Sequence, residues 1–176
     1  MTRIALVLVT TSLLGVAALG ACSGSAGGPA INNSKPAGGE PAAPAAPAVS
    51  SVVSSDILAR EPLANTATVK HILISWRDLL DAFQGHLDPR AQKRSKADAE
   101  AEVRAVLKQL QDGADFDAMM KAHSEDGGSA MSGRAFTVTP DAQLVIEFRQ
   151  LSLRLRPGEY GVIQSDYGFH IIKRIT

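Results

Sequence analysis

The sequence predicts an α+β domain with an antiparallel sheet in the carboxyl-terminal part of the chain. Runs rich in β-branched and aromatic residues, typical of strands, lie at 68–75, 136–139, 160–164 and 169–175. Between the first run and the others, apolar residues recur at helical spacing. One strand, then helices, then further strands is an α+β arrangement. The first and last strands can then lie side by side at the centre of the sheet.

The first half of this domain contains two helix signals and an insertion. After the strand at 68–75, the helical spacing of apolar residues predicts a short amphipathic helix; these residues are Trp76, Leu79, Leu80 and Phe83. A polar loop is expected to follow this helix through Pro89. Ser95 can cap a longer helix that ends at Asp112-Gly113, with this apolar stripe: Ala99, Val103, Val106 and Leu110. Asp115 can cap a second helix with Phe116, Met119 and Met120 on one face, and 124–133 is expected to be loop.

The second half begins with the short strand at 136–139. Pro140-Asp141 is expected to open a helix, which Arg156-Pro157-Gly158 stops, with these apolar positions: Leu144, Phe148, Leu151 and Leu155. The strands at 160–164 and 169–175 then form a hairpin around Ser165-Asp166-Tyr167-Gly168.

The beginning of the chain has the features of a secretory signal over residues 1–21: one early charge, an apolar run and small residues at its end. Leu19-Gly20-Ala21-Cys22 resembles the bacterial lipobox, which implies cleavage before Cys22 and a lipid on its sulfur. Cys22 is the only cysteine of the 176 residues, so no internal disulfide can form and an attachment point is the favoured interpretation. The alternative is an ordinary secretory signal that leaves Cys22 as a free thiol.

Residues 22–66 combine that cysteine with a segment rich in Ala, Pro, Gly and Ser, expected to be a flexible tether. This leaves 67–176 as one folded domain, expected to be a monomer. The 18 Lys and Arg balance the 18 Asp and Glu, so charge indicates no nucleic-acid partner. Ser23 after the cysteine suggests export to the outer membrane, on its periplasmic side, if the cell has one.

Two histidines lie inside the first and last strands, at His71 and His170. An imidazole in an apolar strand needs a hydrogen-bond partner or a function. If the strands pair, the two side chains become cross-strand neighbours. Either histidine alone is equally well interpreted as a buried residue bonded to a backbone carbonyl; the pair, with an acidic loop at 124–130 between them, favours a site.

Several segments, in order, resemble the rotamase domain of parvulin-type peptidyl-prolyl isomerases. They are Lys70-His71-Ile72-Leu73-Ile74, Arg94-Ser95-Lys96-Ala97-Asp98-Ala99, Asp112-Gly113-Ala114-Asp115-Phe116, Ser124-Glu125-Asp126-Gly127-Gly128-Ser129-Ala130, Leu155-Arg156-Pro157-Gly158-Glu159-Tyr160 and Tyr167-Gly168-Phe169-His170-Ile171-Ile172-Lys173. The resemblance covers nearly all of residues 67–176. It implies a four-stranded antiparallel sheet surrounded by helices.

The resemblance also implies roles for individual residues. His71 and His170 match the central histidine pair, and Asp126 the position that is aspartate or cysteine in the family. Ser165 falls at a hydroxyl position near the pair, and Tyr167 at a variable position near the groove. The proline ring would lie against Leu144, Phe148 and Phe136. Neither a metal nor a cofactor is implied.

The chemistry implied is rotation about an X-Pro bond. Its barrier is roughly 18 to 20 kcal/mol, and a thousandfold acceleration lowers it by only about 4 kcal/mol. An apolar groove that disfavours the planar, charge-separated form can supply this without a covalent step.

The sequence departs from the family pattern in one stretch. Where the family usually has Gly-Gly-Asp-Leu-Gly-Trp-Phe, this chain has Gly133-Arg134-Ala135-Phe136-Thr137-Val138-Thr139. Phe136 then falls at the leucine and Thr139 at an aromatic position, which suggests a remodelled groove floor. The insertion at 76–83 is either a helix buried against the domain or a flap over the site.

Two functions remain open on the sequence alone. The first is a lipid-anchored isomerase of the cell envelope that assists folding of exported, proline-containing polypeptides. The second is a non-catalytic parvulin-like chaperone or binding module, motivated by the altered stretch 134–139.

Overall fold

A computed structural model describes residues 50–176 of the chain. The predicted signal at 1–21, Cys22 and the tether as far as residue 49 lie outside the described residues. None of the helices that the structure describes has the length and hydropathy of a membrane span.

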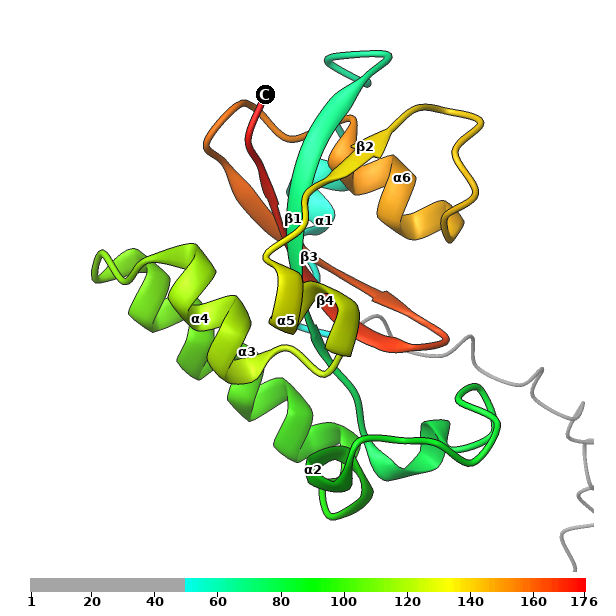
Figure 1. Cartoon of the computed structure of the whole chain (residues 1–176). Helices are drawn as coiled ribbons and strands as arrows, with labels where there is room; N and C mark the ends of the chain where they lie inside the picture. The colour runs from blue at the N-terminus through cyan, green and yellow to red at the C-terminus, as the bar shows by residue number, and fades with distance from the viewer. Residues whose placement is uncertain (1–49) are drawn as a thin grey trace, which may run out of the picture. The chain divides into compact units, whose positions relative to one another are not determined.

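The centre of the fold is a four-stranded antiparallel sheet (Figure 1). Its strands are β1 (Ala67–Ile74), β2 (Phe136–Val138), β3 (Tyr160–Ser165) and β4 (Gly168–Arg174), in the order β2-β1-β4-β3. The α+β class and the central pairing of the first and last strands are therefore confirmed.

The hairpin between β3 and β4 depends on Gly168. Its φ is +136°, and a Cβ there would lie 2.6 Å from the carbonyl oxygen of Ile74 on the neighbouring strand. Only glycine allows this backbone conformation together with this close approach. The turn at Asp166-Tyr167 thus leads directly into β4 beside β1.

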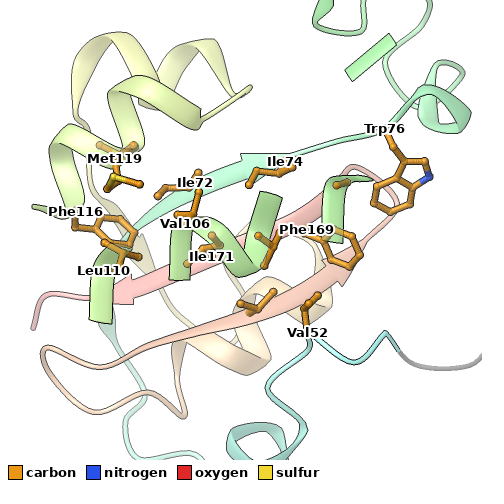
Figure 2. Packing of buried hydrophobic residues seen from close by; sticks show 14 residues of the cluster. Val52, Ile72, Ile74, Trp76, Val106, Leu110, Phe116, Met119, Phe169 and Ile171 are labelled. Carbon is orange, nitrogen blue, oxygen red and sulfur yellow. The ribbon is translucent and has the colours of Figure 1, made fainter. Parts of the chain in front are cut away.

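One face of the sheet packs against two helices, α3 (Lys96–Gln111) and α4 (Phe116–His123). Ser95 accepts the Asp98 N–H, and the Asp98 carboxylate accepts the Ser95 N–H, a capping box that fixes where α3 begins. Figure 2 shows the resulting cluster, in which strand residues such as Ile72 and Ile171 meet Val106 of α3 and Met119 of α4. Both helices begin at the predicted caps.

The opposite face packs against α6 (Ile146–Ser152) and α1 (Ser55–Leu58). Because side chains alternate along a strand, Val69 and Ile172 point to this face, where they pack with Phe148 and Leu151 of α6. His71 and His170 are each two residues away from Val69 and Ile172 along their strands, so their side chains point to the same face. The histidine pair therefore faces α6.

The predicted domain boundary at residue 67 is wrong, because residues 50–66 fold with the domain. Val52 packs in the cluster under α3, and Ile57 of α1 packs against α6. The Ser54 N–H donates to the Val162 oxygen at 2.9 Å, and its hydroxyl accepts the Val162 N–H at 3.0 Å. This segment is rich in small residues, yet two buried apolar side chains and these hydrogen bonds hold it on the outer edge of β3.

Three local predictions differ from the structure. The insertion forms a 3-10 turn, η1 (Arg77–Leu79), and a short helix, α2 (Pro89–Gln92), rather than one amphipathic helix. The loop predicted at 124–133 contains the helix α5 (Gly127–Ser132). The helix predicted to open at Pro140-Asp141 begins only at Ile146, since residues 140–145 form a loop beside the groove.

Candidate functional site

The site is built on the two central strands. β1 and β4 pair so that His71 lies opposite Ile172 and His170 opposite Leu73. The histidines are therefore diagonal neighbours on one face, not directly opposite as the simplest cross-strand pairing would place them. Their rings stack at 14°, and the two Nδ1 atoms are 3.2 Å apart.

The acidic loop reaches this pair because it is fastened to the end of β1. The Glu125 N–H donates to the Leu73 oxygen at 2.9 Å, and the Glu125 carboxylate accepts the Ser75 N–H at 2.7 Å. Arg94 holds the same carboxylate at 2.7 Å. Burial raises the pKa of the Glu125 carboxyl, while the Ser75 N–H and Arg94 oppose that rise. The next residue, Asp126, is thereby placed beside His71.

Asp126 is both a helix cap and a partner of the histidine pair. Oδ1 accepts the Gly128 N–H at the start of α5, and Oδ2 lies 3.0 Å from His71 Nε2. Ser129 donates its hydroxyl to the same oxygen at 2.5 Å. The hydrogen bond from His71, helped by Ser129 and Gly128, holds the pKa of the Asp126 carboxyl far below its usual range.

Ser165 completes the network at the other end. Its Oγ lies 2.8 Å from His170 Nε2 and accepts the Tyr167 N–H at 3.1 Å. Burial, with His71 as a neighbour, lowers the pKa of His170 to about 3, so this imidazole is neutral at pH 7. Ser165 thus bonds the nitrogen of His170 that faces away from His71.

The hydrogen-bond partners assign the proton positions when both imidazoles are neutral. An ionised carboxylate only accepts, so His71 donates from Nε2 to Asp126 and presents a bare Nδ1. His170 must then donate from Nδ1 to His71. Its Nε2 accepts the Ser165 hydroxyl proton. The result is one directed chain of hydrogen bonds from Ser165 to the Asp126 carboxylate.

A groove of about 560 Å³ lies over this network. Phe136 and Phe148 form its apolar floor, both edge-on to His71 with ring centroids 5.2 Å away. Leu144 and Tyr167 also line it. Every residue singled out for the domain's site lines this groove, apart from Ser165, which lies beneath it against His170.

Three polar residues of the site were not expected from the sequence. Ser129 is buried between His71 and Asp126, and it belongs to the Ser124–Ala130 motif, which is the signal that could have identified it. Asp141 and Arg149 line the groove from the loop at 140–145 and from α6. Thr139, at the aromatic position of the family pattern, donates its hydroxyl to Asp141 at 2.7 Å. No sequence signal identifies Asp141 and Arg149 as site residues, because their place depends on the conformation of the loop at 140–145.

The altered stretch 134–139 keeps its strand and carries no backbone strain. Ala67 and Val69 of β1 pair with Val138 and Phe136 in regular register. Among the described residues Gln84 alone is a non-glycine with positive φ, so Arg134 and Thr137 fit where the family pattern has glycine. Gly133 does adopt a positive φ of 65°, as the cap of α5.

The insertion meets the rim of the groove at one point. Phe83 packs edge-on against Tyr167, with ring centroids 5.6 Å apart. Trp76, at the start of the insertion, is instead buried against Phe169 in the core. Within residues 50–176 no three His, Cys, Asp or Glu side chains gather as a metal site.

Comparison with known proteins agrees with this geometry. The family model of the PPIC-type PPIase domain matches residues 55–175. The chain is 30% identical over 115 residues to the chaperone SurA of Saccharophagus degradans, covering 65% of this chain and 24% of that one. It is 28% identical over 112 residues to the foldase protein PrsA of Geobacillus kaustophilus, covering 63% of this chain and 40% of that one. The chain thus spans well under half the length of these relatives.

Two solved structures share the fold. The solution structure of TbPIN1 matches with a TM-score of 0.55 at 20% identity, covering 65% of this chain and 100% of that one. The peptidyl-prolyl isomerase ESS1 from Candida albicans matches with a TM-score of 0.52 at 17% identity, covering 64% of this chain and 63% of that one.

Proposed function

The chain belongs to the PPIC-type peptidyl-prolyl isomerase family, the parvulins, and we propose on this premise that it catalyses cis-trans isomerisation of X-Pro bonds in unfolded polypeptides. The observation that carries the proposal is the chain of hydrogen bonds from Ser165 through His170 and His71 to Asp126, lying directly under a groove with an apolar floor. The groove supplies the binding surface for a proline ring. The network beneath it supplies fixed polar groups.

The proposed mechanism is non-covalent. The ring of the substrate proline packs on Phe136, Leu144 and Phe148, where the low polarity disfavours the planar, charge-separated amide. The network holds the imidazoles in fixed tautomers, so their dipoles are already oriented when the amide twists. Asp126 occupies the position where some family members have cysteine, and its carboxylate is held by His71, Ser129 and Gly128. Its role here is to orient His71.

Exchange spectroscopy by NMR tests the activity without any protease. An Ala-Xaa-Pro-Phe peptide series is incubated with the purified full chain, and the cis-trans exchange rate is measured. Acceleration is expected, and it should fall at least tenfold in His71→Ala. Arg104→Gln, on α3 across the sheet from the groove, is the control and should retain the rate. No acceleration on any peptide would overturn the proposal.

A non-catalytic chaperone is the second candidate. It is favoured by the polar groove wall, where Thr139 holds Asp141 in place of an aromatic side chain, and by the exposed apolar residues Met131 and Ile146 on the two helices beside the groove. This chaperone candidate is tested by measuring whether the chain suppresses the aggregation of an unfolded client protein. Suppression unchanged in His71→Ala, together with no isomerase activity, would favour this candidate.

The cellular setting is also a proposal. The lipobox-like Leu19-Gly20-Ala21-Cys22 supports a lipid such as palmitate on Cys22 and a domain tethered to the cell envelope. The clients would then be exported polypeptides, and the domain itself would act as a monomer. Mass spectrometry of the mature amino terminus tests the anchor, since an unmodified thiol or an intact signal would contradict it.

A further inference from the structure

A second cavity adjoins the groove at Asp126 and Phe136. This cavity has a volume of about 440 Å³. Two of its lining residues, Asp126 and Phe136, also line the groove, and the others are Gly128, Ser129, Ser132 and Arg134. Because the two cavities share these walls, a peptide whose proline occupies the groove can extend a neighbouring side chain into the second cavity. The inference below therefore rests on the proposed function.

Arg134 is the cation of this second cavity. Its guanidinium lies over the Phe136 ring, with Cζ 5.1 Å from the centroid, so the ring that floors the groove also positions the charge. Within residues 50–176 the Arg134 side chain makes no hydrogen bond or ion pair, and it is exposed. Its five N–H donors are therefore open to a bound peptide.

The other charged side chains near the groove each have at least one partner. Arg149 donates one guanidinium N–H to the Pro140 oxygen and, together with the Thr139 hydroxyl, its charge lowers the pKa of the Asp141 carboxyl; its buried Nε has no partner among the described residues. Asp126 points its two oxygens at His71, Ser129 and Gly128. Its negative charge weakens the binding of an anion nearby, but it does not pair with Arg134. Within residues 50–176, Arg134 is thus the arginine beside the groove whose side-chain donors are all unused and exposed, whereas the free Nε of Arg149 is buried.

We propose that Arg134 determines substrate specificity by binding an acidic side chain next to the substrate proline. Arg134 stands where the family pattern has glycine, so this subsite is a feature of this chain. A guanidinium and a carboxylate pair with two parallel hydrogen bonds, a geometry that glutamine reproduces poorly. Since the pair stays partly exposed, the preference for glutamate over glutamine is expected to be threefold to fivefold.

The test compares matched peptides on the full chain. Glutamate and glutamine are placed directly before and directly after the proline, and the cis-trans exchange rate is measured for each pair. At one of the two positions, the exchange rate of the glutamate peptide should exceed that of its glutamine partner. The ratio of these two rates should decrease as the salt concentration is raised. Arg134→Gln should bring the ratio to about one, Arg134→Lys should restore part of it, and Arg104→Gln should leave the ratio unchanged.

Binding separates this inference from the proposed function. The same peptides are titrated against the chain by NMR, so a glutamate preference that Arg134→Gln abolishes supports the subsite even if no peptide is isomerised. Equal binding of both peptides at both positions overturns it. A glutamate preference that survives Arg134→Gln but disappears in Arg149→Gln would show that Arg149 makes the contact, and this result also overturns the inference. The cis-trans exchange rate of the glutamine peptides tests the proposed isomerase activity separately from the subsite.

Discussion

His71 Nδ1 and His170 Nδ1 face each other at 3.2 Å across the two central strands, in diagonal register. This offset leaves each ring its second nitrogen for an outside partner, Asp126 for His71 and Ser165 for His170. The two facing nitrogens share one proton when both rings are neutral. The strand register thereby sets the direction of the whole hydrogen-bond chain.

The first prediction concerns pH. The pKa of His170 is lowered from its ordinary value near 6.5 to about 3 by burial, so the unfolded chain binds a proton at this residue below pH 6.5 and the folded chain does not. The free energy of unfolding therefore falls on acidification between pH 6.5 and about 3, by up to roughly 1.4 kcal/mol per pH unit. Urea unfolding at pH 7, 6, 5 and 4 measures it.

His170→Gln isolates this contribution, because glutamine keeps hydrogen-bonding groups but does not titrate. The difference in unfolding free energy between the original chain and this variant should shrink as pH falls. Asp126 acts in the same direction at lower pH, since its folded-state pKa is depressed and the stability it adds is lost below its unfolded pKa near 4. A difference that stays constant from pH 7 to pH 4 would contradict the assignment.

The second prediction separates packing from substrate binding in the groove. Phe148 is 3% exposed and contacts both histidines and Phe136, so Phe148→Ala should cost about 3 to 4 kcal/mol of stability as well as activity. Leu144 is only partly buried, so Leu144→Ala should cost about 1 kcal/mol or less and chiefly raise KM. Denaturant unfolding and peptide kinetics on both variants test this contrast.

The third prediction concerns two glycines with positive φ. Gly158 has φ of +82° and open space around it, so Gly158→Ala should cost about 1 to 2 kcal/mol for the backbone conformation alone. Gly168→Ala adds the clash with the Ile74 oxygen and should cost clearly more. Thermal unfolding of the two variants gives the comparison. Equal losses would show that β1 and β4 can separate locally at no cost.

The fourth prediction concerns the residue that positions Asp126. The Glu125 side chain is 1% exposed between Arg94 and the Ser75 N–H. Glu125→Gln removes the charge but keeps an acceptor, so we expect about 1 to 3 kcal/mol of lost stability, with Arg94 still paired to Glu102. The activity should fall although Glu125 does not line the groove. A shifted Gly128 amide resonance would report displacement of Asp126, and an unmoved resonance with full activity would contradict the positioning role.

Where the sequence predicted the fold well, local signals and packing agreed. The helix after Ser95 has a capping box and an apolar stripe of four buried residues, so its beginning and its inner face were both predictable. The β3-β4 hairpin has β-branched strands around a turn with glycine. The histidine pair could be anticipated because strands alternate and the two strands are central.

Two of the three elements that the sequence did not predict depend on contacts between residues far apart in the chain. Four of the six residues of helix α5 are glycine or serine, which have low helix propensity, and the helix forms where Asp126, itself held by His71, caps its first turn. Helix α6 begins later than predicted because residues 140–145 form a loop, in which Asp141 accepts the Thr139 hydroxyl. The insertion is held at its start by the Arg94 oxygen, which accepts the Arg77 N–H, while the Arg94 side chain binds the Ser75 oxygen and Glu125. Asp126 and His71, and Arg94 and its two partners, are far apart in the sequence, whereas Thr139 and Asp141 are near neighbours whose contact is one of many that a loop could form.

The segment around Ser54 has a consequence for how the sheet can pair with an extended peptide. By satisfying the outward N–H and oxygen of Val162, it blocks the exposed edge of β3 against an additional strand. The other edge, β2, is only three residues long. An extended peptide is thus denied backbone pairing with the sheet at Val162, and under the proposed function this protects the domain from being drawn into aggregates of unfolded chains.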